Sequence, residues 1–122
     1  HLGQSSFPVA EARQLLGPDK LIGVSTHTPQ EIAASEGANF IIFGPIYYTP
    51  SKVAYGEPQG LDRLREAVQQ SVAPVFAIGG INAERVAEVF EIGAFGIAVI
   101  SAISAASDPA QAARELLHRI ES

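Results

Sequence analysis

Two neighbouring apolar segments end in small residues that could bind a phosphate. The segment Val75–Ile78 is followed by Gly79 and Gly80, and the segment Phe95–Ile100 is followed by Ser101. The glycines could direct two backbone N–H groups at an oxyanion, and Ser101 could add its hydroxyl and its amide. The alternatives are a tight turn at the glycines and a helix N-cap at Ser101. Because both segments end in such groups, together they favour phosphate binding.

Two further residues could contribute a charge or a proton. Lys52 lies in a long proline- and glycine-rich segment beside Ser51 and close to Thr49, and an ammonium group can hold a phosphate or a carboxylate. The alternative is a solvated loop lysine. His27 follows the apolar stretch Leu21–Ser25, and an imidazole of ordinary pKa, about 6.5, can transfer protons at neutral pH. A hydrogen-bonded loop histidine is the alternative there.

The acidic residues do not predict a metal site. No carboxylate stands at the end of a predicted strand, because Asp19, Asp62 and Asp108 all fall at the margins of predicted helices. The chain has no cysteine, which excludes disulfides and cysteine-rich metal sites. We therefore predict no metal site within this chain.

Strand-like and helix-like segments alternate along the chain. Short apolar runs indicate buried strands, and apolar residues at helical spacing indicate helices between them. The predicted strands are residues 1–4, 21–25, 40–43, 75–78 and 95–100, and the predicted helices are about 8–16, 29–36, 61–71, 81–92 and 109–120, with a short turn at 102–107. This order predicts a single α/β domain over residues 1–122 with a parallel sheet of five βα units.

Five such units could form an open doubly wound sheet or more than half of a β/α barrel. No GxGxxG dinucleotide motif follows any predicted strand, which argues against a nucleotide-binding sheet. In eight-stranded barrels, phosphates commonly bind in the loops after the last two strands, as Gly79-Gly80 and Ser101 would do here. The long loop at residues 45–60 is of a length that usually serves function. These features favour the barrel.

Composition limits the possible partners. The 122 residues are 47% hydrophobic and 17% charged, and the net charge of −5 argues against binding nucleic acid or an anionic membrane surface. No apolar run approaches the roughly 20 residues of a membrane span. A cytoplasmic location is the default expectation. The chain begins at His1, within a predicted strand end, and has no methionine. We therefore expect it to be the C-terminal part of a longer protein.

Five segments together resemble one family. HLGQ, GVSTHT, GPIYYTPSK, AIGGI and AVISAI are similar, in order and spacing, to the C-terminal two-thirds of thiamine-phosphate synthases. They equally resemble that family's relatives, the thiazole tautomerases of TenI type. The resemblance implies a (β/α)8 TIM barrel of which this chain forms strands 4 to 8.

The resemblance also implies a set of substrate contacts. Thr49 and Ser51 would hold a thiazole, Lys52 would reach a pyrophosphate, and Ser25 would face the substrates. The thiazole phosphate would be bound mostly through backbone groups of Gly79, Gly80, Ile100 and Ser101. The implied partner is thus a small phosphorylated thiazole, and the chain would either form a homodimer or be completed by further N-terminal strands.

Two departures bear on which reaction is catalysed. Synthases usually carry an acidic magnesium ligand at the position of Ser6, and a serine is a poor substitute for a carboxylate on Mg²⁺. The first three strands, which supply basic contacts and another magnesium ligand in synthases, are not in this sequence. Tautomerases need neither, and use a histidine at the position of His27 to move a proton on the thiazole. The sequence therefore favours cofactor-free thiazole tautomerisation, with His27 and Lys52 as catalytic candidates.

Two alternatives stay open. One is the synthase reaction, a magnesium-dependent transfer that joins aminopyrimidine diphosphate to thiazole phosphate with loss of pyrophosphate. The other is a catalytically silent phosphate-binding or regulatory relative. The family is enzymatic, but we expect these 122 residues alone to be inactive.

Overall fold

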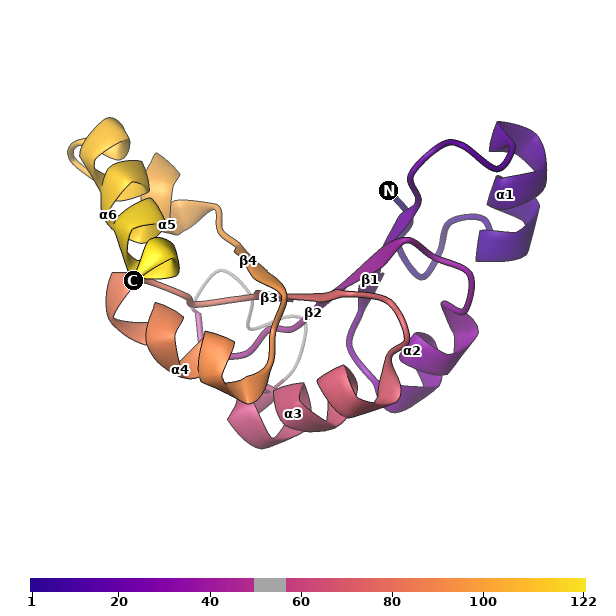
Figure 1. Ribbon diagram of the computed structural model, residues 1–122, viewed down its shortest axis with the longest axis horizontal. Helices are drawn as coiled ribbons and strands as arrows, with labels where there is room; N and C mark the ends of the chain where they lie inside the picture. The colour runs from indigo at the N-terminus through magenta and orange to yellow at the C-terminus, as the bar shows by residue number, and fades with distance from the viewer. Residues whose placement is uncertain (50–56) are drawn as a thin grey trace.

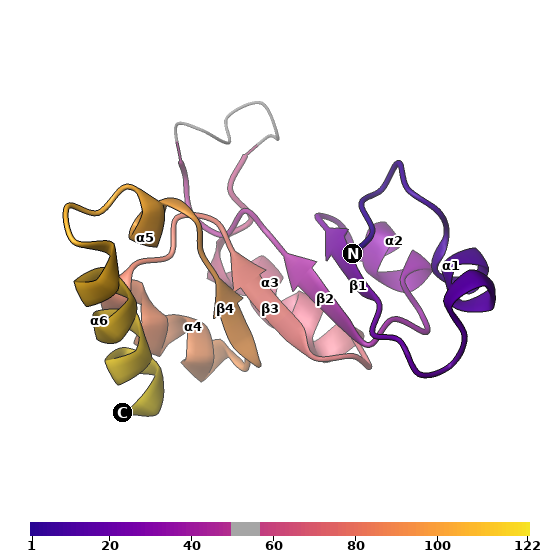
Figure 2. The ribbon, with the colours of Figure 1, turned by 90° about the horizontal axis from the view of Figure 1, so that it is seen from above.

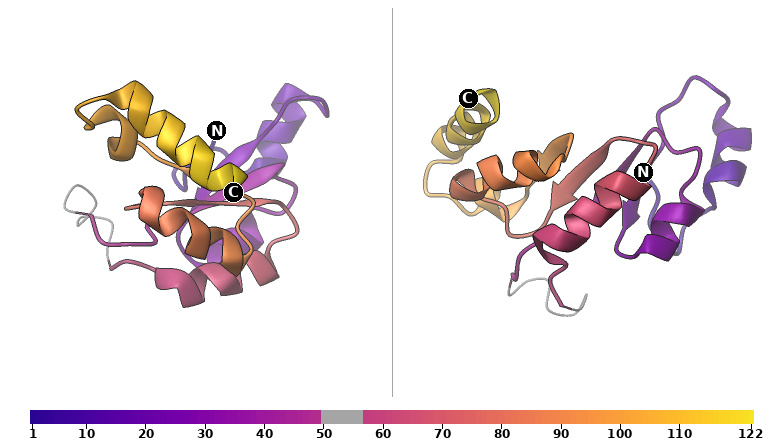
Figure 3. Two further views of the ribbon diagram at one scale, coloured as in Figure 1. Left: turned by 60° about the vertical axis from the view of Figure 1, so that its left-hand side comes forward. Right: turned by 60° about the horizontal axis from the view of Figure 1, so that its bottom comes forward.

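Four parallel strands form one curved sheet whose outer face is covered by helices (Figures 1 and 3). The structure is a computed structural model and describes residues 1–49 and 57–122. The strands follow the chain in spatial order, β1-β2-β3-β4, each beside the next. The elements are α1 (Val9–Leu16), β1 (Gly23–Thr26), α2 (Pro29–Ala34), β2 (Phe40–Phe43), α3 (Gly60–Gln70), β3 (Val75–Ile78), the 3-10 helix η2 (Ala83–Arg85), α4 (Val86–Ile92), β4 (Gly96–Ala98), α5 (Ser101–Ser104) and α6 (Pro109–Glu121).

Local signals define several helix ends. Thr28 caps α2, where its side chain accepts the N–H of Glu31 at 3.1 Å. Asp108 caps α6 in the same way through the N–H of Gln111. Gly93 ends α4 with φ at 111°, a conformation that costs a glycine little. These contacts involve neighbours in the chain, which is why the sequence alone predicts them.

The hydrophobic core lies between the sheet and the helices. Alternate residues of β2 and β3 face the helices and are buried, because successive side chains of a strand point to opposite faces. The largest core side chains of α3 and α4, including Leu64 and Val86, are completely buried against them. The buried strand residues of this cluster are Ile41, Phe43, Val75 and Ala77.

The opposite, concave face of the sheet is not covered by any described helix (Figure 1). Phe40, Phe76 and Phe95 form a row of edge-to-face contacts across it, with ring centroids 5.6 and 5.5 Å apart. The rings of Phe40 and Phe76 lie over Gly23 and Gly96, where a Cβ would come within 2.2 and 2.6 Å of them. The glycines thus make room for an aromatic layer on this face.

The ends of the sheet differ from the sequence prediction. The predicted strand at residues 1–4 is reduced to one bridge, in which Leu2 pairs with Val24. The predicted strand 95–100 is only Gly96–Ala98. The predicted segment is not buried as expected, because Phe95 and Ile100 are 67% and 64% exposed. The prediction of five strands was therefore wrong for the described chain: it has four strands and one bridge.

Two further findings concern the helices. The predicted turn at 102–107 contains the short helix α5, which begins at Ser101. Within the part of the chain that the structure describes, no helix is both long enough and apolar enough to cross a membrane. The parallel α/β order agrees with a TIM-barrel-like fold, and the assignment to strands 4 to 8 of such a barrel stays a prediction.

Candidate functional site

The carboxyl ends of the strands gather the candidate residues at one edge of the sheet. Because all four strands are parallel, the segments that follow β2 and β3 lie at the same edge as α5, which follows β4 (Figure 2). A cavity of about 550 Å³ lies there. Its lining includes Thr49, Gly79, Gly80, Ile100 and Ser101. The structure therefore brings together the residues predicted to bind a phosphate.

The Gly79-Gly80 turn requires glycine at both positions. Their φ angles are 105° and 69°, which L-residues with a side chain rarely adopt. A Cβ on Gly79 would lie 2.6 Å from the Cα of Pro45, and one on Gly80 would lie 2.8 Å from the Cβ of Tyr47. The turn thus packs directly against the chain segment that follows β2.

Hydrogen bonds fix the direction in which the peptide groups of this turn point. The carbonyl of Gly79 accepts the N–H of Tyr47 at 3.0 Å, and the carbonyl of Gly80 accepts Nη1 of Arg85 at 2.5 Å. The C=O and N–H of a trans peptide point in opposite directions. The N–H groups of Gly80 and Ile81 therefore point away from these partners. Within residues 1–49 and 57–122, neither N–H donates to another protein group.

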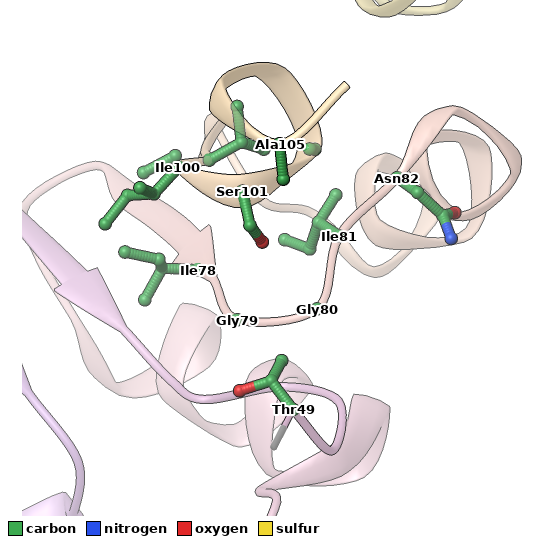
Figure 4. A pocket seen from close by; sticks show the side chains of 12 residues that line it. Thr49, Ile78, Gly79, Gly80, Ile81, Asn82, Ile100, Ser101 and Ala105 are labelled. Atoms are coloured by element: carbon green, nitrogen blue, oxygen red, sulfur yellow. The ribbon is translucent and has the colours of Figure 1, made fainter. Parts of the chain in front are cut away.

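Ser101 lies across the cavity from this turn. Figure 4 shows its side chain directed from the start of α5 toward Gly79 and Gly80. Ser101 is the first residue of α5 and Ile100 is the N-cap position, without a side-chain capping bond. The alternative that Ser101 serves as a helix N-cap is therefore wrong, because Ile100 occupies that position.

Thr49 lies on the other side of the turn (Figure 4). Its hydroxyl oxygen is buried and has no hydrogen-bond partner among the described residues. A buried hydroxyl without a partner is costly, so it is a group that a ligand could satisfy. Ser51 and Lys52, the neighbouring candidates, lie outside the described residues.

A second cavity, of about 390 Å³, adjoins the first and contains the histidine candidate. Ser25 and His27 line it together with His1, and Gly79 lines both cavities. Nδ1 of His27 lies 3.0 Å from Oε1 of Glu31, and Nε2 of His1 lies 2.8 Å from Oγ of Ser25. A neutral His27 that donates from Nδ1 keeps Nε2 as a proton acceptor. The arrangement can therefore accept a proton beside the cavity that the Gly79-Gly80 turn and Ser101 line.

Sequence reasoning missed a cluster of three side chains behind the glycine turn. The Tyr47 hydroxyl donates to the Glu88 carboxylate, and the Arg85 guanidinium lies over the Tyr47 ring, 4.2 Å from its centroid. Burial, and then the hydrogen bond to Glu88, raise the pKa of the Tyr47 hydroxyl above its ordinary value. The only sequence signal was the spacing of Arg85 and Glu88, which places them one helical turn apart. Nothing in the sequence linked them to Tyr47.

Ser6, at the position where synthases carry an acidic ligand, lies in the turn after Leu2. Its hydroxyl accepts the N–H of Gly3 at 3.0 Å. Among the described residues, no three histidine, aspartate or glutamate side chains are grouped so as to hold a metal ion. The described residues therefore do not fit a complete magnesium site.

Comparisons with known proteins match this architecture. The family model described as thiamine monophosphate synthase matches residues 1–103. The chain is 49% identical over 122 residues to a thiamine-phosphate synthase of Synechocystis, covering 98% of this chain and 35% of that protein. It is 48% identical over 118 residues to a thiamine-phosphate synthase of Chloroflexus aurantiacus, covering 95% of this chain and 54% of that protein.

A solved structure gives the same result. The thiamine phosphate pyrophosphorylase of Pyrococcus furiosus superimposes with a TM-score of 0.87 at 35% identity, covering 98% of this chain and 57% of that one. The chain thus spans between about a third and just over half the length of these three relatives. The match runs through both cavities, from His1 to beyond Ser101. The chain therefore belongs to the thiamine monophosphate synthase family.

Proposed function

We propose that this chain forms the thiazole-phosphate-binding part of a thiamine-phosphate synthase. Such an enzyme joins the methylene carbon of an aminopyrimidine diphosphate to the ring nitrogen of a thiazole phosphate and releases pyrophosphate. The names of the relatives support this reaction over the tautomerisation that the sequence favoured, because both proteins and the solved structure carry synthase or pyrophosphorylase names.

One observation carries the proposal. The N–H groups of Gly80 and Ile81 point away from Tyr47 and Arg85, which bind the carbonyls of the same two peptide groups. Ser101 faces this turn from across the cavity. Backbone N–H groups and a hydroxyl that converge on one space are the donors that a phosphate monoester needs. An anchored phosphate would place the thiazole ring near Thr49 and the cavity that His27 lines.

The roles of the remaining candidates are those that the family resemblance implies. Lys52 would neutralise the departing pyrophosphate, and Thr49 and Ser51 would contact the thiazole. Mg²⁺ would stabilise the leaving pyrophosphate when bound. Because the described residues do not fit a complete magnesium site, we assign no step of this chain to the metal.

A two-substrate assay tests the proposal in the full-length encoded protein. Aminopyrimidine diphosphate and thiazole phosphate are supplied with and without Mg²⁺, and thiamine phosphate is measured. Formation that depends on Mg²⁺ supports the synthase. A protein that binds thiazole phosphate but forms no product under either condition would instead be the silent relative.

Thiazole tautomerisation is a second candidate, because the contact between His27 and Glu31 favours it. The carboxylate fixes the imidazole and leaves one nitrogen able to accept a proton. Isomerisation of the thiazole without metal, lost in His27→Asn, would support this reaction. Thiamine phosphate formation that is insensitive to His27→Asn would argue for the synthase alone.

A further inference from the structure

We infer that Arg85, supported by Tyr47 and Glu88, is a positioning residue that sets the direction of the phosphate-binding N–H groups. The inference rests on the proposed binding of a phosphate at the Gly79-Gly80 turn. Arg85 does not line the cavity, so it would act through the peptide group that joins Gly80 to Ile81.

The Gly80–Ile81 peptide needs a partner that selects its orientation. Glycine adopts positive and negative φ almost equally well, so a turn with two consecutive glycines can rotate its peptide groups at little steric cost. Nη1 of Arg85 donates to the Gly80 carbonyl at 2.5 Å. This bond holds the carbonyl on the Arg85 side, and the Ile81 N–H must then point the other way.

Arg85 is itself held in place from two sides. Its guanidinium stacks over the ring of Tyr47, with 4.2 Å between the guanidinium carbon and the ring centroid. The Tyr47 hydroxyl is bonded to Glu88, which lies one helical turn after Arg85. The planar guanidinium can stack and donate at the same time, which a lysine ammonium cannot do. The cluster therefore uses properties specific to arginine.

Tyr47 links both peptide groups of the turn. Its backbone N–H donates to the Gly79 carbonyl at 3.0 Å, while its ring supports the arginine that holds the Gly80 carbonyl. Two successive N–H groups, those of Gly80 and Ile81, thus depend on the position of one residue. Tyr47 also precedes Thr49 by two positions, so the same segment carries the buried hydroxyl in the cavity. A displacement of Tyr47 would disturb the anion donors and the position of the Thr49 hydroxyl together.

The hydrogen bond from a cation also strengthens the donors. A charged donor on the Gly80 carbonyl polarises the peptide group and makes the Ile81 N–H a better donor to an anion. Arg85 would thus contribute to phosphate binding without contacting the phosphate. Loss of the Arg85 side chain would therefore weaken phosphate binding through the Gly80–Ile81 peptide group and not through loss of a direct contact with the phosphate.

The test compares phosphate binding of the full-length encoded protein with that of Arg85→Ala, Arg85→Lys and Arg85→Gln. Inorganic phosphate and thiazole phosphate are the probes, and the amide shifts of Gly80 and Ile81 are followed by NMR during the titration. We expect Arg85→Ala to weaken both affinities by about tenfold and to shrink the phosphate-induced shifts of these two amides. Arg85→Lys and Arg85→Gln should each restore only part of the affinity.

Chemical rescue separates positioning from a merely structural role. Guanidinium at low millimolar concentration should restore part of the phosphate affinity of Arg85→Ala, because it can occupy the space over Tyr47 and donate to Gly80. Arg114→Ala is the matched control, since Arg114 lies on α6 and, among the described residues, its side chain donates to Gln111 alone. It should bind phosphate as the parent does, with or without guanidinium.

Three outcomes would overturn the inference. If the parent binds phosphate and Arg85→Ala binds it equally well, the proposed function stands and the role of Arg85 falls. If Arg85→Ala binds more weakly but guanidinium rescues nothing and the Gly80 and Ile81 shifts are those of the parent, the role is structural only. If the parent itself binds neither probe, the proposed function and the inference fail together.

Discussion

Nδ1 of His27 lies 3.0 Å from Oε1 of Glu31, and the same oxygen accepts the backbone N–H of His27 at 3.2 Å. The carboxylate is fixed in turn, because Glu31 occupies the capping-box position of α2 and its other oxygen accepts the Thr28 hydroxyl. A helix N-terminus thus orients an imidazole at the edge of a cavity.

Removal of the Glu31 carboxylate should leave the His27 imidazole in the site but without its fixed orientation. In Glu31→Ala, we expect any thiazole isomerisation to fall in kcat by about tenfold or more, with a smaller change in KM, because the phosphate anchor is untouched. Steady-state kinetics measure both constants. Glu36→Ala, at an exposed position after the same helix, is the control. A change confined to KM would contradict a positioning role for Glu31.

A carboxylate at position 101 should abolish phosphate binding. Ser101→Glu would place a negative charge opposite the N–H groups of the Gly79-Gly80 turn, where it would compete with and repel an anion. Calorimetric titration with thiazole phosphate measures the loss. Ser104→Glu adds the same charge to the same helix at an exposed residue outside the cavity lining. Equal affinity in the two variants would show that the anion binds elsewhere.

Alanine at Gly80 should cost more stability than alanine at Gly60. Both glycines have positive φ, 69° and 77°, so each substitution forces an L-residue into a left-handed conformation at about 1–2 kcal/mol. At Gly60 a Cβ would meet nothing within 4 Å, whereas at Gly80 it would lie 2.8 Å from Tyr47 Cβ. Urea unfolding of both variants isolates the cost of the clash. Equal destabilisation would mean that the turn relaxes away from Tyr47.

The raised pKa of Tyr47 predicts a loss of stability in alkali. Burial and Glu88 keep the folded hydroxyl protonated above the ordinary tyrosine pKa of about 10. Above that pH the unfolded state releases this proton and the folded state does not, so the Tyr47 contribution to the free energy of unfolding falls as the pH rises. Below about pH 10 it is constant. Tyr47→Phe should have a shallower alkaline decline than the parent, and Tyr48→Phe, at the exposed neighbour, controls for the lost hydroxyl.

The uncovered face of the sheet predicts association of these 122 residues when they are produced alone. Phe40, Phe76 and Phe95 present an aromatic row without a covering layer in the described chain, and exposed apolar surface favours self-association. Sedimentation should then give a mass above the 12.8 kDa of one chain. Phe76→Ser should reduce the association, while Phe7→Ser, at an exposed aromatic before α1, should not. A monodisperse monomer that unfolds cooperatively would contradict this prediction.

The sequence by itself determined the features that depend on near neighbours in the chain. The caps Thr28 and Asp108 and the stop at Gly93 were predictable because each contact is made within four residues. The alternation of strands and helices followed from apolar periodicity. The Gly79-Gly80 turn and Ser101 were also found from sequence, because parallel strands place all their carboxyl ends at one edge.

Only the tertiary structure decided what lies against each of these elements. The strand at residues 95–100 was expected to be buried, but whether a strand is buried depends on partners far away in the chain. The same holds for the cluster behind the glycine turn. Tyr47 is separated from Glu88 by 41 positions, and no local pattern records that their side chains meet. The donors of the proposed phosphate site are local, and so is the bond from Arg85 to the Gly80 carbonyl. The contacts of Tyr47 with Gly79 and Glu88 are long-range and come only from the folded chain.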